Sequence, residues 1–288
     1  MTVTRALPDA AALAGPTGSP AGLPDAGPTA ALRAPRPFAL VRHSAALARR
    51  SLIKTWRTPE ALIDVTIQPA IFLLIFVYTF GGAVAGSTAD YLQFLLPGIL
   101  AQSIATAGIA IGVNLNTDLE KGIFDRFRAL PIPRSAPLLG AVLGDVVRYV
   151  IVTVSTLTVG YAMGFRIGTS VPALLAACAL GVLFALCLSW MSVFVGMKAR
   201  TSGAVQGIMF LLVMPLTFAS AMFVPADSLP GWMQGFVHGN PLTHLVGAMR
   251  GLLVGGPVAS DIAWTLGWCA ALVAIFMPLA MRAYRRKL

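Results

Sequence analysis

Polar and ionisable side chains within long apolar runs are the residues of this chain that could do chemistry. Asp145 and Arg148 lie three residues apart in such a run, close enough to pair on one face of a helix. Ionisable groups in apolar segments are functional candidates by default. We interpret the two residues as a structural ion pair rather than as a proton relay.

Two stripes of side chains at four-residue spacing favour a path for an organic molecule. The first runs from Asp64 to Phe80 and changes from polar to aromatic, and the second runs from Phe210 to Met222. Aromatic rings and thioethers form adaptable surfaces for flat, amphipathic compounds. Packing against other helices or lipid is the alternative for any single residue. The predicted path comprises Gln68, Phe72, Phe76, Phe210, Met214 and Phe218.

Signatures of enzyme active sites are missing from the sequence. It contains no Gly-x-x-x-x-Gly-Lys-Ser/Thr phosphate loop, no Gly-x-Ser-x-Gly nucleophile turn and no His-Glu-x-x-His pair. The histidines do not cluster with cysteines or carboxylates, and the cysteines lie in apolar runs without metal-ligand spacing. We therefore expect no enzymatic activity, no metal site and no bound cofactor on this chain.

Composition indicates an integral membrane protein. Of the 288 residues, 57% are hydrophobic and 11% are charged, whereas soluble domains carry roughly 25% charged residues. The net charge of +10 would suit nucleic-acid binding, but eighteen of the 21 Lys and Arg residues lie on one set of alternate loops. Only Arg166 and Arg250 lie on the opposite set. This asymmetry argues against a nucleic-acid partner and predicts that both termini are cytoplasmic.

Apolar runs divide the chain into an N-terminal tail and an all-α membrane domain over residues 38–288. Residues 1–37 lack apolar periodicity, and we predict a disordered cytoplasmic tail. Residues 38–57 combine helical apolar spacing with basic side chains, which is typical of an amphipathic helix lying among lipid headgroups. Six runs long enough to cross a membrane follow. They cover about 61–82, 92–116, 138–163, 171–197, 203–224 and 260–281.

A charged segment at residues 118–130 separates the second and third of these runs. Read as a helix, it places Phe124, Phe127 and other apolar residues on one face. It would be roughly 18 Å long, too short to cross a membrane, and Pro131 interrupts its continuation. We predict a cytoplasmic helix that docks on a soluble partner; a loop lying on lipid headgroups is the alternative.

The segment at residues 225–257 is apolar but interrupted by proline and glycine. Asn240 is placed to be the N-cap of a helix that begins with Pro241, and apolar residues at helical spacing continue to Leu253. A helix of this length is about 21 Å long, again too short to span. We predict two short re-entrant helices on the non-cytoplasmic side, rather than an ordinary external loop.

Short motifs occur in a characteristic order after about residue 38. They are Asp64-Val-Thr66 with Pro69, Leu96-Pro-Gly98, Lys121-Gly-Ile-Phe-Asp-Arg-Phe-Arg128 ending in Leu130-Pro131, Gly144-Asp145 with Arg148-Tyr149, Pro230-Gly-Trp232, Asn240-Pro241 and Arg250-Gly251. In this order and spacing the chain resembles the permease subunits of type 2 ABC exporters. Within them it is most similar to the daunorubicin/doxorubicin-resistance permeases of actinobacteria. The tail at 1–37 lies outside the resemblance.

The resemblance implies six spans, an interfacial helix, a cytoplasmic coupling helix and two re-entrant helices. It further implies that two permease copies, which we expect to be a homodimer, pair with two ATPase subunits. ATP and Mg²⁺ would bind to those partners. The residues expected to contact the ATPase are Glu120, Gly122, Ile123, Phe124, Phe127 and Arg128.

These observations together predict a plasma-membrane permease that exports an amphipathic, drug-like or anthracycline-like compound. The direction of transport comes from the resemblance alone. Export of lipids or lipid-linked glycans within the same superfamily is one alternative. A secondary transporter is another; it would need charges near the bilayer midplane and internal repeats, which we do not find in the sequence.

Overall fold

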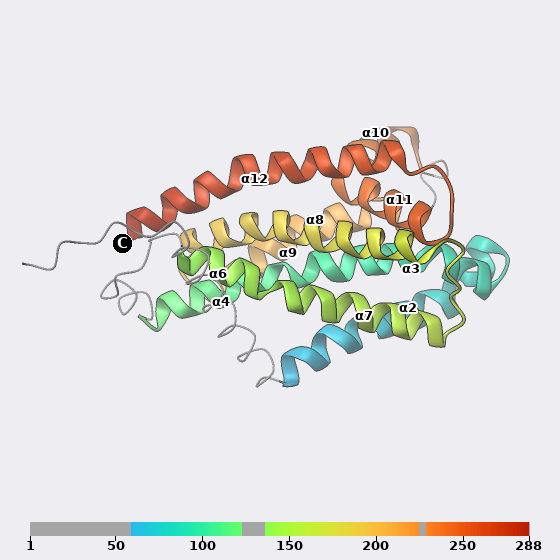
Figure 1. Cartoon of the computed structure of the whole chain (residues 1–288), viewed down its shortest axis with the longest axis horizontal. Coiled ribbons are helices and arrows are strands. Elements are labelled where there is room, and N and C mark those ends of the chain that lie inside the picture. The colour runs from blue at the N-terminus through green and yellow to red at the C-terminus, as the bar shows by residue number, and fades with distance from the viewer. Residues whose placement is uncertain (1–58, 123–135, 225–228, 288) are drawn as a thin grey trace, which may run out of the picture. The chain divides into compact units, whose positions relative to one another are not determined.

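The computed structural model describes residues 59–122, 136–224 and 229–287, which fold into α-helices joined by turns (Figure 1). No β-strand occurs within those ranges, which confirms the predicted all-α class. The predicted tail at 1–37 and interfacial helix at 38–57 lie outside them. The helices are α2 (Pro59–Ala85), α3 (Thr88–Ala107), α4 (Ile109–Glu120), α6 (Ala136–Gly144), α7 (Val146–Ala162), α8 (Val171–Lys198), α9 (Ser202–Phe218), α10 (Gly231–Gly239), α11 (Pro241–Leu253) and α12 (Ala259–Lys287).

Within the described ranges, five helical stretches are long and apolar enough to cross a membrane, as expected for a multi-pass membrane protein. They are Ile67–Ala85, Thr88–Glu120, Leu138–Ala162, Val171–Lys198 and Ala259–Arg286. Each overlaps a predicted apolar run, because the sequence prediction and the helical stretches of the structure both depend on about 20 consecutive apolar residues. The second stretch joins α3 to α4 through Gly108, whose backbone is itself helical.

The prediction of a fifth long span over 203–224 is wrong in its extent. Helix α9 ends at Phe218, and its 17 residues correspond to about 25 Å. The side-chain amide of Asn240 explains the early end, since it donates to the carbonyl oxygens of Leu216 (2.6 Å) and Ala219 (2.7 Å). These donors satisfy carbonyl groups that the end of a helix leaves unpaired.

The turn after α9 also changes the position of Met222. The sequence placed this residue on the same stripe as Phe218, one helical turn further along. In the structure Met222 is buried against α3, and its side chain occupies the space above Gly98, where a Cβ atom would overlap it. Met222 therefore belongs to the core and not to a stripe on α9.

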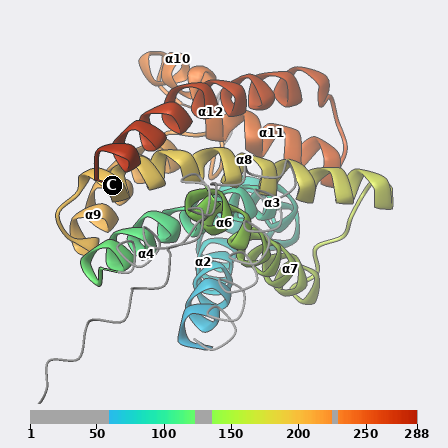
Figure 2. The same ribbon diagram turned by 60° about the vertical axis from the view of Figure 1, so that its left-hand side comes forward.

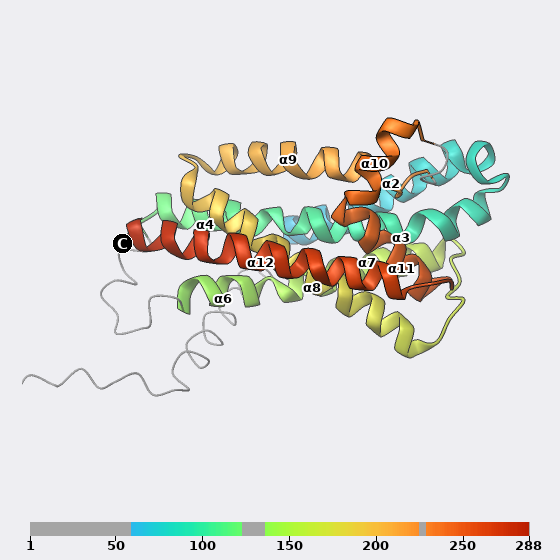
Figure 3. The same cartoon turned by 90° about the horizontal axis from the view of Figure 1, so that it is seen from above.

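Helices α3 and α8 lie at the centre of the packing. Helix α8 contacts α4, α11 and α12, and α3 contacts α2, α7 and α11. Helix α12 packs along α8, and α7 lies beside α2 (Figure 1, Figure 2). Seen from above, α9 runs alongside the line formed by α4 and α3 (Figure 3). This arrangement places α3–α4 between α8 on one side and α2, α7 and α9 on others.

Glycines allow α4 and α8 to approach closely. A Cβ atom at Gly112 would overlap the carbonyl oxygen of Ser192, and one at Gly196 would overlap that of Gly112. The Ser192 hydroxyl donates to the carbonyl oxygen of Ile109 at 2.9 Å across the same contact. The Gly-x-x-x-Gly spacing that ends at Gly112 therefore belongs to an intramolecular helix contact.

Two short helices, α10 and α11, precede α12 as the sequence predicts. The Asn240 Oδ1 atom accepts a hydrogen bond from the Leu242 N–H group (2.9 Å), which confirms the predicted N-cap before Pro241. At 13 residues, α11 is too short to span a membrane. Re-entry of this helical pair into the bilayer remains a prediction.

Candidate functional site

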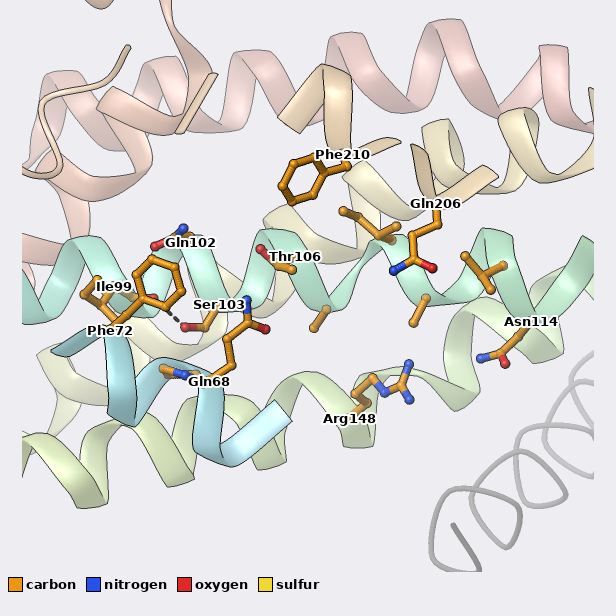
Figure 4. A pocket seen from close by; sticks show the side chains of 15 residues that line it. Gln68, Phe72, Ile99, Gln102, Ser103, Thr106, Asn114, Arg148, Gln206 and Phe210 are labelled. Atoms are coloured by element: carbon orange, nitrogen blue, oxygen red, sulfur yellow. Dashed lines mark hydrogen bonds between the residues drawn. The ribbon is translucent and has the colours of Figure 1, made fainter. Parts of the chain in front are cut away.

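A cavity of about 440 Å³ lies between α2, α3–α4, α7 and α9 (Figure 4). It combines polar and aromatic side chains from helices that are far apart in the sequence. The side chains that define it chemically are Gln68 and Phe72 of α2, Gln102, Ser103 and Thr106 of α3, Asn114 of α4, Arg148 of α7, and Gln206 and Phe210 of α9. Seven of its fifteen lining residues are polar or charged, and Gln68, Gln206 and Phe210 are exposed, so it is an open pocket with a mixed polar and apolar wall.

Half of the predicted path residues line this cavity. Gln68, Phe72 and Phe210 belong to its wall, which brings the two predicted stripes together. The spacing of four residues from Gln68 to Phe72 places both on one side of α2. Passage of a substrate along them remains a prediction.

The other predicted path residues lie outside the cavity. Phe76 and Phe218 both stack on Phe223, with ring centroids 4.6 Å and 5.4 Å from it. Met214 is half-buried on α9 and is not part of the cavity wall. The two stripes therefore meet at Phe223, a residue of the turn that the sequence had assigned to a helix.

The sequence did not identify Gln102, Thr106 and Gln206 as site residues. Gln102 is only 7% exposed and faces the cavity together with Thr106, one turn later on α3. A signal was available, because polar residues recur at four-residue spacing within an apolar run at Gln102 and Thr106. Gln206 lies four residues before Phe210, on the same face of its helix.

The amide groups around the cavity have free hydrogen-bonding capacity. Within the described residues, the side chains of Gln68, Gln102, Asn114 and Gln206 form no hydrogen bond. Ser103 differs, since its hydroxyl donates to the carbonyl oxygen of Ile99 at 2.6 Å. Amides that face a cavity can donate to and accept from a ligand or water.

Asp145 and Arg148 are both buried, with 5% and 9% of their surfaces exposed. Arg148 contributes to the cavity wall, and its Nε and Nη1 atoms find no acceptor in the described part of the chain. The next residue, Tyr149, fixes α7 to α8 through a hydroxyl–hydroxyl contact of 2.6 Å with Ser189. The structural ion pair between Asp145 and Arg148 remains a prediction.

Arg250, by contrast, has several protein partners near the other end of α3. It donates to the carbonyl oxygens of Phe94 (3.2 and 3.3 Å) and Ala221 (3.2 Å), and its guanidinium lies 3.8 Å from the centre of the Phe94 ring. Burial lowers the pKa of Arg250 to about 10, and Asp261 acts in the opposite direction. The group therefore stays protonated at neutral pH and anchors α11 to α3.

The predicted ATPase-contact segment is described only at its start. Helix α4 includes residues 118–120 and ends at Glu120, so a separate helix does not begin at residue 118 as predicted. The chain then turns at Gly122, whose φ of 65° favours glycine. The carboxylate of Glu120 accepts a hydrogen bond from the Ser202 N–H group (3.2 Å). Ile123, Phe124, Phe127 and Arg128 lie outside the described residues.

Comparison with known proteins identifies the family. The family model of the ABC-2 type transporter matches residues 43–254. The daunorubicin resistance ABC transporter permease protein DrrB1 of Streptomyces coeruleorubidus is 41% identical over 238 residues, which cover 83% of this chain and 84% of that protein. The probable doxorubicin resistance ABC transporter permease protein DrrC of Mycobacterium tuberculosis is 27% identical over 238 residues, or 82% and 86% of the two chains. The chain belongs to the ABC-2 type transporter family and is a membrane permease.

Proposed function

We propose that this permease exports an amphipathic, drug-like or secondary-metabolite compound, driven by ATP that a separate subunit hydrolyses. The observation that carries the proposal is the cavity, in which Phe72 and Phe210 accompany amide and guanidinium groups. Such a wall suits a molecule with a flat apolar body and polar substituents. The similarity to a daunorubicin resistance permease supports the same class of substrate.

A complete transporter would contain two copies of this chain and two ATPase subunits. Membership of the ABC-2 type transporter family supports this composition, as does the lack of a phosphate loop in the sequence. ATP and Mg²⁺ would bind to the partner subunits. In the plasma membrane, α9 would form a short additional crossing, so that six crossings leave both termini in the cytoplasm.

The described helices suggest how ATP-driven closure could reach the cavity. The proposed coupling segment follows α4 directly, and Asn114 on α4 lines the cavity. A force on the segment would also reach α9, because Glu120 accepts a hydrogen bond from the first residue of that helix. Helices α4 and α9 would then move together relative to α2 and α7 and open the cavity to the far side.

Reconstituted transport tests the proposal. We expect inside-out vesicles that contain the permease and its ATPase to accumulate a flat amphipathic compound, either the cation daunorubicin or an aromatic acid, only when ATP is present. Equal uptake without the ATPase, driven by a proton gradient, would contradict ATP coupling and favour a secondary transporter. Uptake of fluorescent phospholipid in place of either compound would favour the lipid-exporter alternative.

The partner interface can be tested separately in the same vesicles. Phe124→Ala/Phe127→Ala should lose most of the co-purified ATPase and most ATP-dependent uptake at matched membrane expression, because aromatic anchors dominate helix-in-groove contacts. Phe236→Ala, an exposed position on α10, is the control and should behave like the wild type. An unchanged complex in the double variant would exclude these residues as the docking site.

A further inference from the structure

Arg148 brings a buried positive charge to the wall of the cavity. Its side chain is 9% exposed, and Nε and Nη1 have no hydrogen-bond acceptor in the described ranges. Figure 4 shows the side chain extending from α7 toward α4, on the side of the cavity where Asn114 lies. A buried donor without an acceptor costs free energy, and the cost is larger for a charged group. Nε and Nη1 therefore favour an oxygen acceptor, which a ligand group or water can supply.

A comparison with Arg250 shows that this arrangement is not general in the fold. Arg250 is partly buried, and backbone carbonyl groups and an aromatic ring surround its guanidinium. Asp145 lies three residues before Arg148 and can balance part of its charge. Charge balance alone does not supply the acceptors that Nε and Nη1 of Arg148 lack.

Phe72 and Arg148 lie toward opposite ends of the pocket, and Phe210 lies between them in the view of Figure 4. Phe72 lies beside Ile99, whereas Arg148 lies toward Asn114 (Figure 4). Ile99 and Asn114 are fifteen positions apart on α3–α4, about 22 Å along a helix axis, so the pocket extends over about four helical turns. Amide groups of Gln102 and other residues face the space between. An elongated ligand could contact both parts at once.

We propose that the molecule bound in this cavity carries an anionic oxygen group, a carboxylate or a phosphate, that pairs with Arg148. A guanidinium presents parallel donors that match such groups, with bidentate geometry. The apolar body of the same molecule lies against Phe72 and Phe210. An acidic exported compound and the phosphate of a lipid from the cytoplasmic leaflet offer this same chemistry. Assignment of the group to the exported substrate rests on the proposed function.

Binding to the purified permease, without ATPase, tests the charge requirement directly. The probes are 12-(9-anthroyloxy)stearate, an elongated aromatic acid, and its uncharged methyl ester, followed by fluorescence in nanodiscs with empty nanodiscs as the blank. We expect at least tenfold tighter binding of the carboxylate. Arg148→Gln should remove this preference and Arg148→Lys should restore part of it. Lys198→Gln removes an exposed positive charge at the end of α8 and should leave the preference unchanged. Equal binding of both probes to the wild type would overturn the proposal.

A second variant keeps the test valid if Arg148→Gln does not fold. Asn114→Asp places a competing carboxylate in the cavity while Arg148 remains present. We expect the carboxylate probe to bind at least tenfold more weakly, with ester binding unchanged. Undiminished carboxylate binding in a folded Asn114→Asp variant would contradict the role of Arg148.

Lipid analysis and transport separate the possible sources of the anion. Phospholipid that co-purifies with the wild type but not with Arg148→Gln would identify a lipid phosphate as the group bound. Carboxylate preference without retained lipid would identify an acidic substrate. With the ATPase present, ATP-dependent uptake of the ester at the same rate as the acid would overturn the inference but leave the export function intact. A preference for binding the acid without any ATP-dependent uptake would contradict the export function and leave the inference about Arg148 intact.

Discussion

Polar side chains are hydrogen-bonded on one face of the α3–α4 unit and face an open pocket on the other. On the face toward α8, Asn116 and Ser192 donate hydrogen bonds to backbone carbonyl oxygens across the helix contact. On the face toward α2, α7 and α9, Gln102, Thr106 and Asn114 line a cavity and form no hydrogen bond within the described residues. The same helical unit thus has a close-packed contact with α8 on one face and the wall of the pocket on the other.

This difference separates stability from recognition. A polar side chain that bonds to a neighbouring helix holds the two helices together, and its loss leaves buried carbonyl groups unpaired. A polar side chain that faces a cavity contributes little to folding and keeps its donors and acceptors for a ligand. Substitutions on the α8 face should therefore change unfolding, and substitutions on the cavity face should change binding.

The largest effect is expected at the closed contact, from Gly112→Val. The new side chain would overlap the carbonyl oxygen of Ser192 and force α4 away from α8. We expect the free energy of unfolding to fall by about 3 kcal/mol, measured by thermal unfolding in detergent. Gly207→Ala on α9 is the control, since nothing lies near a Cβ at that position. A Gly112→Val variant as stable as wild type would show that the contact is not close-packed.

Asn116→Leu should have the next largest effect. Asn116 Nδ2 donates to the carbonyl oxygens of Gly196 (2.9 Å) and Ala199 (3.0 Å) at the end of α8. Loss of both bonds should lower stability by about 2 kcal/mol. Asn114→Leu, the same change on the cavity face, should alter stability by less than about 0.5 kcal/mol because no bond is lost. Equal destabilisation by the two substitutions would show that polar side chains on the α8 face and on the pocket face contribute equally to stability.

Arg148→Met should leave stability unchanged or raise it by about 1 kcal/mol, because an apolar side chain of similar size replaces a buried charge. Thermal unfolding of the purified variant provides the measurement. A loss of about 3 kcal/mol or more would instead indicate that Arg148 and Asp145 form the structural ion pair predicted from the sequence.

The smallest effect is expected from Glu120→Ala at the exposed end of α4. Its carboxylate caps the start of α9, and an exposed interaction with a helix N-terminus contributes about 0.5 kcal/mol or less. Co-purification of the ATPase should fall less than in Phe124→Ala/Phe127→Ala. A complex lost completely in Glu120→Ala would make this carboxylate the main docking residue, and the cap on α9 would be secondary.

Sequence reasoning succeeded where the property was local. The N-cap at Asn240, the two short helices around it and the five long apolar stretches all follow from residue type and run length. It failed at the end of α9, where the amide of Asn240 reaches back to Leu216 and Ala219. The apolar run continues beyond Phe218 in the sequence. No residue close to Phe218 in the chain indicates that the side chain of Asn240 will donate hydrogen bonds there.

The site was predicted only in part, for the same reason. Gln68, Phe72 and Phe210 were identified because four-residue spacing puts them on one face of a helix. Phe76 and Phe218 share that spacing, but they pack on Phe223 instead. Periodicity gives the face of a helix and does not give the depth at which a cavity begins or ends.

The sequence by itself determined that the chain is an all-α membrane protein and which segments can cross a bilayer. These properties depend on composition and on the length of apolar runs, which neighbouring residues decide. Only the tertiary structure decided that Arg148 of α7 meets Asn114 of α4 and Gln206 of α9 around one cavity. That meeting depends on how each helix is rotated and how closely it packs, and contacts such as Gly112 against Ser192 set both through residues distant in the chain.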